Sequence, residues 1–302
     1  MRICSLLPSA TEILYAIGLG ESVLGVSHEC DFPADAATKP VLLRPRVDPH
    51  ATPAEIDRAV SEIIARGESI YALDAELLHS ILPDLILTQD LCHVCAASPD
   101  DLATALARFP KPPAVLSLTP RSLDEVWDDV CRVGEATGRM REAEELASQL
   151  AQRVAAIASK SAQAGTRPHV LCLEWLDPYY VGGHWVPEMV FKAGGEDLLG
   201  TPRKPSFRVT GEQVLAARPD VIVVMPCGYN VARTAAEFRM EQLPRGIENS
   251  PAIQQRRLFG VDANAYSRPG PRLAEGVALL AHLLHPELFP SDFPAGSFRR
   301  LI

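Results

Sequence analysis

The stretch LHSILPDLIL at residues 78–87 has a counterpart in VLAARPDVIVV at residues 214–224. Each is typical of a helix end, a Pro-Asp turn and a buried strand, because an unbroken apolar run follows the turn. A second pair agrees with the first: EILYAIGLGE at residues 12–21 and EMVFKAGGE at residues 188–196. Two copies of one αβ unit predict two similar lobes, and small ligands commonly bind in a cleft between lobes.

The order of the predicted elements indicates the fold class. Strands that alternate with helices predict an α/β fold with two lobes, each with a mainly parallel sheet flanked by helices. Residues 122–164 carry apolar side chains at helical spacing, which predicts one long rigid helix that joins the lobes, with Gly134 and Gly138 as candidate positions for a kink. We therefore expect an N-terminal αβ lobe at residues 1–120, a connecting helix at 121–165 and a C-terminal αβ lobe at 166–302. The residues after the final predicted helix are expected to form a tail.

The composition limits the classes of partner. The chain is 47% hydrophobic, which is ample for two cores, and its formal net charge is −9. That charge disfavours nucleic acid and anionic membranes as partners. No stretch approaches the ~20 apolar residues of a membrane-spanning helix, so no membrane insertion is expected.

The first residues and the cysteines bear on location. MRICSLL leads directly into the first predicted strand, without a basic segment, apolar run and cleavage site. This pattern predicts a cytoplasmic protein; a periplasmic or cell-surface location would follow if a leader had been removed. The chain has seven cysteines, an odd number, and we expect them to be reduced.

The loops after the strands are where a ligand is expected, because ligands of open parallel sheets bind outside the carboxyl ends of the strands. These loops are rich in His, Cys and aromatic residues. Flat rings with polar tips line pockets for large planar ligands, although such rings can also be core residues. The candidate ligand-binding residues are Ser9, His28, Glu29, Cys30, Gln89, Cys92 and His93 in the first lobe, and Glu174, Trp175, Tyr179, Tyr180, Cys227, Tyr229, Tyr266 and Arg268 in the second.

Some of these residues are also candidate metal ligands. His28, Cys92, His93 and Cys95 are residue types that bind soft transition metals, and Cys92-x-x-Cys95 has the spacing of a ligand pair. The alternative is that they are ordinary loop histidines and inert thiols, since zinc sites usually show two such pairs. The sequence has no nucleophile elbow, phosphate loop, dinucleotide fingerprint or His-Glu-x-x-His motif. We therefore assign no catalytic residue and do not expect an enzyme.

Several of these features resemble one family. SATEIL at residues 9–14 after the first strand, the paired Pro-Asp strands and the long helix are similar to the substrate-binding proteins of ABC importers for vitamin B12, haem and iron siderophores. The resemblance covers nearly the whole chain, and residues 8–12 and 262–272 look most like the vitamin B12-binding branch.

The resemblance implies binding without chemistry. A cobalamin-like corrinoid would lie between the lobes, the long helix would limit their closure, and the partner would be the permease of an ABC importer. Cobalt could take an axial ligand from His28, His93 or a thiolate. In the family, one acidic residue in each lobe meets the permease; here the matching positions carry Asp100 or Asp101 in the first lobe, and Arg233 followed by Glu237 in the second.

Other functions stay open. A cytoplasmic carrier or sensor would account for the missing leader. Haem or a siderophore would need several basic groups, for which the candidates are Arg268, Arg44, Arg46 and Arg208. A zinc ion, or an enzyme that uses the loops of Cys92, His93 and His28, are the remaining alternatives.

Overall fold

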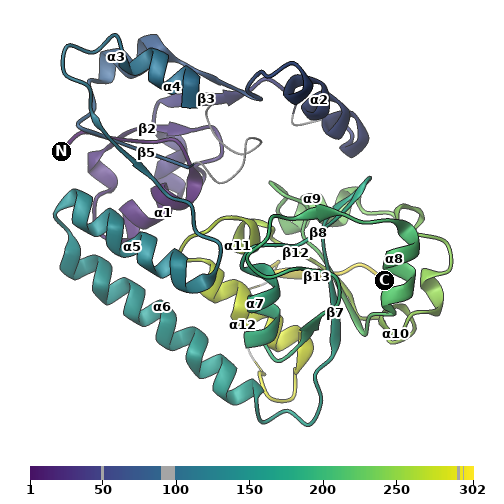
Figure 1. Ribbon diagram of the computed structural model, residues 1–302. Helices are drawn as coiled ribbons and strands as arrows, with labels where there is room; N and C mark the ends of the chain where they lie inside the picture. Colours follow the sequence, from purple (N-terminus) through teal and green to yellow (C-terminus); the bar gives the residue numbers. More distant parts are fainter. Residues whose placement is uncertain (49–50, 90–98, 291–292, 295) are drawn as a thin grey trace. The chain divides into compact units, whose positions relative to one another are not determined.

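Two compact units make up the chain in the computed structural model, which describes residues 1–48, 51–89, 99–290, 293–294 and 296–302 (Figure 1). Unit 1 comprises residues 1–120 and 127–148, and unit 2 comprises residues 121–126 and 149–302. The sequence suggested lobes at residues 1–120 and 166–302 with a connecting helix at 121–165, and this division stays a prediction.

Unit 1 is built on a sheet with the order β4-β3-β2-β1-β5-β6. All neighbouring strands are parallel except β3 and β4. Its strands are β1 (Ile3–Ser5), β2 (Val23–Ser27), β3 (Val41–Pro45), β4 (Tyr71–Leu73), β5 (Leu85–Thr88) and β6 (Ala114–Ser117). Its helices are α1 (Pro8–Ala16), α2 (Pro53–Ala65), α3 (Ala75–Ile81) and α4 (Pro99–Leu106), with 3-10 turns at Gly20–Ser22 and Ala34–Thr38.

Unit 2 has a sheet with the order β10-β8-β7-β11-β12-β13, and β9 also pairs with β7. β7, β9, β11 and β12 pair in parallel, whereas β8, β10 and β13 pair antiparallel. Its strands are β7 (His169–Leu176), β8 (Tyr179–Val181), β9 (Glu196–Asp197), β10 (Phe207–Arg208), β11 (Val221–Val224), β12 (Leu258–Val261) and β13 (Phe298–Arg300). Its helices are α7 (Val186–Lys192), α8 (Gly211–Ala217), α9 (Val231–Glu237), α10 (Pro251–Gln254), α11 (Asn264–Ser267) and α12 (Leu273–Leu284), with 3-10 turns at Met240–Gln242 and Ile247–Asn249. The α/β fold with a mainly parallel sheet in each lobe is thereby confirmed.

The two Pro-Asp turns make the same contacts in their own units. The Asp84 carboxylate accepts the backbone N–H of Arg2 at 2.7 Å, and the Asp220 carboxylate accepts that of His169 at 2.9 Å. The backbone N–H of each aspartate donates in return to the carbonyl of the same partner, at 2.8 Å in both units. Each turn therefore fixes the start of the unit's first strand, β1 or β7, beside the strand that follows the turn.

The helix ends in the repeated segments also match. α3 and α8 end at left-handed residues, Leu82 with φ 49° and Arg218 with φ 44°. α1 and α7 are followed by the left-handed glycines Gly18 and Gly194, with φ 80° and 91°. A left-handed residue ends a helix because its carbonyl leaves the helical direction. The internal repeat predicted from the sequence is therefore present in both units.

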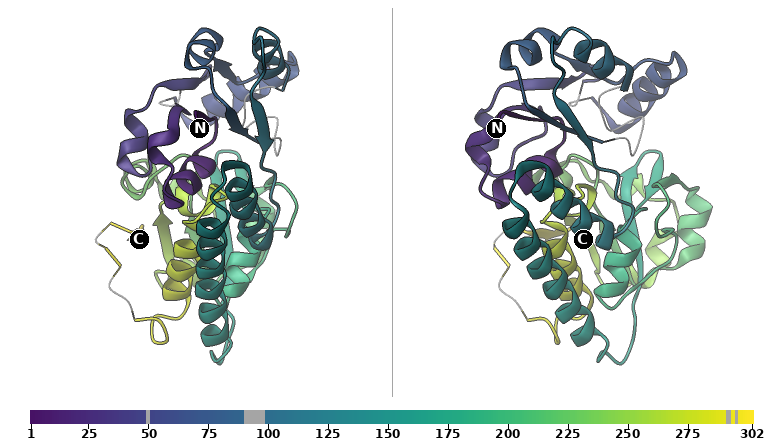
Figure 2. Two further views of the ribbon diagram at one scale, coloured as in Figure 1. Left: turned by 90° about the vertical axis from the view of Figure 1, so that its left-hand side faces the viewer. Right: turned by 60° about the vertical axis from the view of Figure 1, so that its left-hand side comes forward.

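The connecting segment differs from the expected single helix. It forms α5 (Leu123–Thr137) and α6 (Met140–Ser161), which are separated at Gly138, where φ is +70°. A Cβ on Gly134 would lie 2.3 Å from the Cβ of Ala143, so this glycine permits close packing of α5 against the first turns of α6. Figure 2 shows these two stretches side by side. Helical periodicity could not reveal that the chain reverses at a glycine.

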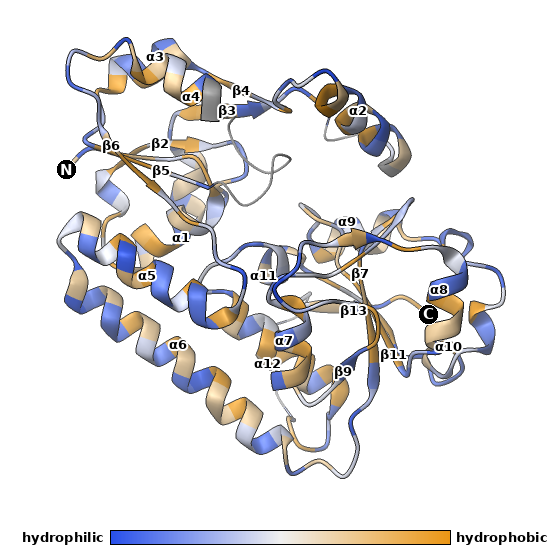
Figure 3. Cartoon of the chain, in the orientation of Figure 1, coloured by the Kyte–Doolittle hydropathy of each residue, from blue (hydrophilic) through white to orange (hydrophobic). Residues whose placement is uncertain are grey.

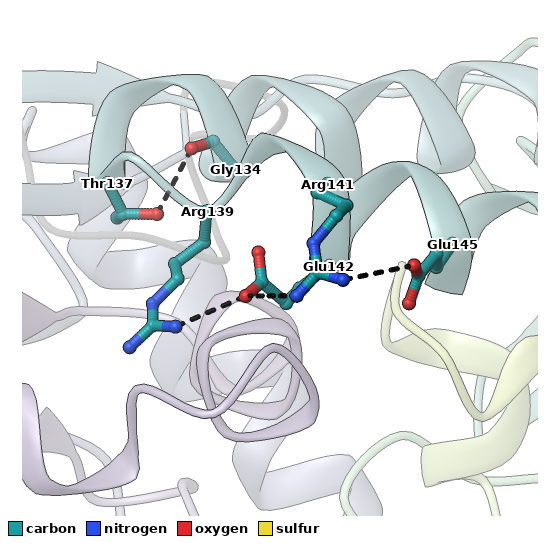
Figure 4. Close-up of polar contacts among 6 residues, drawn as sticks. All are labelled: Gly134, Thr137, Arg139, Arg141, Glu142 and Glu145. Carbon is teal, nitrogen blue, oxygen red and sulfur yellow. Dashed lines mark hydrogen bonds and ion pairs between the residues drawn. The ribbon is translucent and has the colours of Figure 1, made fainter.

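Figure 4 shows the polar contacts at the break, which involve half-buried and exposed side chains. The Thr137 hydroxyl donates to the Gly134 carbonyl at 3.4 Å, and Arg139 and Arg141 lie 3.2 and 3.5 Å from the Glu142 carboxylate. Exposed ion pairs of this kind contribute only about 0–1 kcal/mol each. We infer that the positive φ of Gly138 and the close approach at Gly134, more than these charges, fix the turn.

Each unit has its own apolar core, and Figure 3 shows hydrophobic residues along the central strands. Ile86 of β5 and Leu42 of β3 are fully buried in unit 1, as are Ile222 and Val224 of β11 in unit 2. Fully burying such a side chain contributes about 1.5–3 kcal/mol.

The expectation of a C-terminal tail was wrong. β13 pairs with β12, and the last two residues pack against the unit 2 core. Phe298 at the start of β13 also meets the ring of Phe259 at 6.0 Å between centroids. This apolar packing holds the end of the chain in the sheet.

Candidate functional site

A row of three aromatic side chains with an arginine at each end lies on one side of unit 2. Trp175 on β7 stands opposite Tyr180 on β8, which stands opposite Arg208 on β10. Side chains of directly opposed residues lie on the same face of an antiparallel pair. Tyr229, in the loop after β11, extends the row, with its ring 5.8 Å from Trp175 in an edge-to-face arrangement.

Guanidinium groups stand at both ends of this row. Arg233 lies over the Tyr229 ring at 3.7 Å and donates to its hydroxyl at 3.1 Å. Arg208 lies 6.0 Å from the centre of the Tyr180 ring. We call Arg208, Tyr180, Trp175, Tyr229 and Arg233 the aromatic row. Flat rings between two guanidinium groups, of which Arg233 is also paired with Glu237, suit a planar ligand with anionic or hydrogen-bonding substituents.

Two features keep Tyr229 in the row as a neutral phenol. Burial raises the pKa of Tyr229 to about 12, and a hydrogen bond to Glu237 adds to this effect. Glu237 also pairs with Arg233 at 2.7 Å, which fixes the guanidinium beside the ring.

Glu174 precedes Trp175 on β7. A Cβ on Gly182 would lie 3.4 Å from the Glu174 carboxylate. Burial raises the pKa of Glu174 to about 7; a hydrogen bond from Ser206 opposes this, and the charge of Asp197 adds to it. Burial likewise raises the pKa of Asp197 to about 6. These carboxyl groups are therefore able to hold protons close to neutral pH.

Other predicted residues of unit 2 lie elsewhere. Tyr179 points away from the row: it packs against the apolar core and donates from its hydroxyl to the Gln242 carbonyl at 2.7 Å. Tyr266 is completely buried and its hydroxyl donates to the Gly276 carbonyl at 3.2 Å, so it is a core residue of unit 2 and not a surface for a ligand. Arg268 is also buried, whereas Cys227 is exposed in the loop after β11.

His28 is the most clearly oriented candidate of unit 1. Its Nδ1 lies 3.1 Å from the Leu43 carbonyl oxygen, which also accepts the backbone N–H of His28 at 3.0 Å. The tautomer consistent with this contact has the proton on Nδ1 and leaves a lone pair on Nε2. The Tyr71 ring packs beside the imidazole at 5.5 Å, and Glu29 lies 3.9 Å from Nε2. A histidine that ligates a metal through Nε2 commonly donates a hydrogen bond from Nδ1 to a carbonyl oxygen, which fixes the orientation of the ring.

Cys30 and Ser9 are less accessible than the sequence suggested. Cys30 is 3% exposed, and its sulfur lies 3.0 Å from the Thr11 hydroxyl and 3.2 Å from the Ser27 hydroxyl. Ser9 is buried in the first turn of α1. We interpret both as internal residues of unit 1, while Gln89 is half-buried just beyond β5.

The predicted metal-binding loop falls outside the described residues. Cys92, His93 and Cys95 are not among them, so their role stays a prediction. Within the described residues, no group of three or more His, Cys, Asp or Glu side chains is arranged to hold a metal ion. The five described cysteines are free thiols, and burial raises the pKa of Cys4 to about 12.

Two members of the aromatic row were not in the predicted site. Arg208 was considered only as a basic group for haem or a siderophore, and Arg233 only as a residue at a docking position. Arg208 joins the row through its pairing with Tyr180, a register that the sequence alone does not specify. The contact of Arg233 with Tyr229 depends on the turn into α9, which the sequence alone does not specify.

Relatives of this chain are substrate-binding proteins. An uncharacterized ABC transporter substrate-binding lipoprotein of Bacillus subtilis is 26% identical over 300 residues, covering 95% of this chain and 81% of that protein. A vitamin B12-binding protein of Yersinia pestis is 26% identical over 243 residues, covering 80% of this chain and 75% of the relative. The periplasmic haem-binding protein of Roseiflexus has a similar structure, with a TM-score of 0.70, 26% identity and coverage of 95% and 99%.

These relatives overturn the expected cytoplasmic location. They are described as a lipoprotein and as a periplasmic protein, which points to a location outside the cytoplasm. The prediction was wrong because it relied on the first residues of the sequence alone. Among the described helices, none combines the length and apolar character needed to cross a bilayer.

The model of the periplasmic binding proteins matches residues 3–265, which include strands β1 to β12 of the two sheets. The fold of two sheet-containing units agrees with the solved structure above. The chain therefore belongs to the periplasmic binding protein family.

Proposed function

We propose that this protein is the substrate-binding component of an ABC importer for a planar metal chelate, with a cobalamin-like corrinoid as the first candidate. The observation that carries the proposal is the aromatic row of unit 2. The vitamin B12-binding relative supports the corrinoid, and the substrate-binding lipoprotein supports a role in import. The partner would be the importer's permease, and the site of action would be outside the cytoplasm.

The row suits a ligand with a broad flat face. Trp175 and Tyr180 are half-buried, so each ring has both a fixed position and accessible surface. Contact between aromatic rings and a macrocycle removes apolar surface from water, at roughly 25 cal/mol per Å². Peripheral amide groups of a corrinoid could accept hydrogen bonds from the guanidinium groups of Arg208 and Arg233.

Haem is the second candidate, because the two ends of the row are arginines. Carboxylates on the edge of a haem would make charge-assisted hydrogen bonds with them, which are stronger than bonds to neutral amides. The haem-binding protein of Roseiflexus is similarly close in sequence to this chain. The charge of the row therefore favours haem, while the vitamin B12-binding relative favours the corrinoid.

His28 is the candidate axial ligand on unit 1. The Leu43 carbonyl near Nδ1 would keep Nε2 available for a cobalt or iron centre, and Tyr71 would fix the ring. A cleft between the two lobes stays a prediction. A ligand that needs both His28 and Trp175 would have to contact both units.

Parallel titrations with hydroxocobalamin and with hemin test the proposal. Calorimetry would give the affinity, and the absorption bands would report ligation. We expect one-to-one binding of one chelate with a dissociation constant on the order of 1 μM or tighter. Trp175→Ala should weaken binding at least about tenfold, since it removes a large contact area. His28→Ala should remove any band shift and leave part of the affinity.

Phe191→Ala is the matched control. Phe191 is an exposed aromatic residue of unit 2 with Arg167 over its ring at 4.4 Å, but it lies outside the row. It should bind the chelate like the unsubstituted protein. A protein that binds neither chelate would refute the proposal. Equal losses of affinity in Trp175→Ala and Phe191→Ala would also refute it. Turnover of a bound chelate would instead support an enzyme.

A further inference from the structure

One end of the aromatic row contains a carboxylate as well as a guanidinium. Glu237 is the last residue of α9, one turn after Arg233, and residues four apart lie on the same side of a helix. The Nε of Arg233 donates to the Glu237 carboxylate at 2.7 Å. The side chain of Arg233 is 28% exposed and that of Glu237 is 43% exposed, so a ligand on the row has access to both. We call these two residues the Arg233–Glu237 pair.

The surroundings of Arg233 hold the pair in one place. Tyr229 is only 4% exposed, so its ring is a fixed base for the guanidinium, which lies 3.7 Å from the ring centre. The Tyr229 hydroxyl accepts another hydrogen bond from the guanidinium at 3.1 Å. The start of α9 is fixed as well, because the Asn230 side chain accepts the backbone N–H of Arg233 at 2.9 Å and Thr234 is buried. The pair is therefore a defined feature of the row and not a contact between two freely moving side chains.

Helix stability does not account for Glu237. A negative charge at the last position of a helix meets the negative end of the helix dipole, which is unfavourable. An arginine four residues before a glutamate is also the weaker of the two orders for an ion pair on a helix. The position of the pair beside Tyr229, whose ring meets Trp175, instead favours a role in contact with a ligand.

The pair offers a hydrogen-bond donor and an acceptor side by side. A guanidinium only donates hydrogen bonds, and an ionised carboxylate only accepts them. A primary carboxamide can use both, because its oxygen accepts and its NH₂ group donates. A ligand carboxylate has only acceptors, so it would be attracted by Arg233 and repelled by Glu237. Glu237 thus offsets the positive charge of Arg233 at the point that a ligand carboxylate would approach.

We propose that Glu237, through the Arg233–Glu237 pair, makes this end of the row select a chelate edge that carries carboxamides over one that carries carboxylates. Glu237 acts by holding the guanidinium of Arg233 and by offsetting its charge. Because the pair belongs to the aromatic row, this role rests on the proposed function. Amide groups of a corrinoid would bind at the Arg233 end, and Glu237 would reduce the attraction of that end for the carboxylates of haem.

The test compares ligands that differ only at the edge of the macrocycle. Hydroxocobalamin is compared with the monocarboxylic acids that form when one of its propionamide groups is hydrolysed, and hemin is compared with its diamide. Calorimetry of the whole protein gives the ratio of affinities, amide form over carboxylate form, for each macrocycle that binds. Glu237→Gln keeps a hydrogen-bonding side chain and removes the charge, so it should lower this ratio at least about threefold for hemin or for at least one of the corrinoid acids. Glu237→Lys reverses the charge and should lower the same ratio at least about tenfold.

Glu212→Gln is the matched control. It makes the same change in net charge at an exposed residue of α8, and it should leave the ratio within about 1.5-fold of that of the unsubstituted protein. Glu237 is exposed at a helix end, so both of its variants should fold. A role of Glu237 in docking to a permease would not affect these titrations, because they contain the binding protein alone.

Unchanged ratios in Glu237→Gln and Glu237→Lys would overturn the proposed role of Glu237 and leave the proposed function intact. Equal losses of affinity for both forms of a macrocycle would overturn it too, because they would show that Glu237 only supports the structure. An effect of Glu212→Gln of the same size would show that net charge alone is responsible, which would also overturn it. A protein that binds none of the probes would refute the proposed function and the role of Glu237 together.

Discussion

Replacing Glu174 by glutamine should make unit 2 more stable above neutral pH. The folded protein holds the pKa of Glu174 at about 7, mainly because the carboxyl group is removed from water, whereas the ordinary value is 4.5. A carboxylate that is buried without a cation beside it opposes folding. Glutamine has nearly the same shape, cannot ionise, and keeps a hydrogen-bonding group for Ser206.

The magnitude follows from the two pKa values of Glu174. Each pH unit between them corresponds to 1.36 kcal/mol, so a separation of about 2.5 pH units corresponds to roughly 3 kcal/mol. Between pH 4.5 and 7 the folded protein binds a proton that the unfolded chain has released. The free energy of unfolding therefore falls as pH rises through this window and then stays low. Below pH 4.5 both states are protonated and the group contributes no difference.

Urea unfolding at several pH values between 4.5 and 8 measures the effect. Glu174→Gln should match the unsubstituted protein near pH 4.5 and exceed its free energy of unfolding by about 2–3 kcal/mol at pH 8. Asp197 also has a raised pKa and is present in both proteins, so the difference between them reports the burial of Glu174 together with its repulsion from Asp197. Glu212→Gln, at an exposed residue of α8, is the control and should change stability by less than about 0.5 kcal/mol. Equal pH dependence of the Glu174→Gln variant and the unsubstituted protein would refute the argument.

Three further predictions concern the fold and are measured by urea unfolding. Asp220→Ala should cost about 1–3 kcal/mol, because it removes the acceptor of the N–H that begins β7, and an unchanged stability would contradict this role. Leu82→Gly should stabilise by about 0.5–1 kcal/mol, because φ is 49° at an exposed position; a loss of stability would show that the leucine side chain matters more than its backbone. Gly134→Val should cost about 1–3 kcal/mol, because the new Cβ would lie 2.3 Å from a side chain of α6. Gly165→Ala, where a Cβ meets nothing within 4 Å, is its control, and equal effects would contradict the packing argument.

The repeat could be predicted because its determinants are local in the sequence. A proline fixes the turn, the following aspartate binds backbone groups nearby, and an apolar run marks the buried strand. The contacts of Asp84 and Asp220 show that these short segments form the same hydrogen bonds in both units. The break between α5 and α6 was harder to predict from the sequence, because Gly138 interrupts the helix without changing the period of its apolar residues.

The candidate site was only partly predictable, because it depends on pairing between strands. Tyr179 and Tyr180 are neighbours of the same type, yet one packs in the core and the other lies in the row. Alternation along a strand puts adjacent residues on opposite faces, but the face follows from the register with Trp175, which the sequence does not state. Arg208 joins the row for the same reason.

The two units differ where the row is built, and the difference explains its position. The partners of the Pro-Asp turns, Arg2 and His169, are equivalent points at the starts of β1 and β7. β1 then ends at Ser5, whereas β7 continues to Leu176. The additional residues of β7 pair with β8, and β8 pairs with β10, which brings an antiparallel ribbon to the end of the parallel sheet. The shared part of the repeat thus provides the scaffold, and the extension of β7 provides the surface that we propose for the ligand. Sequence reasoning succeeded on the part that the two units share because that part is specified twice, and it was weakest on the extension, which occurs once.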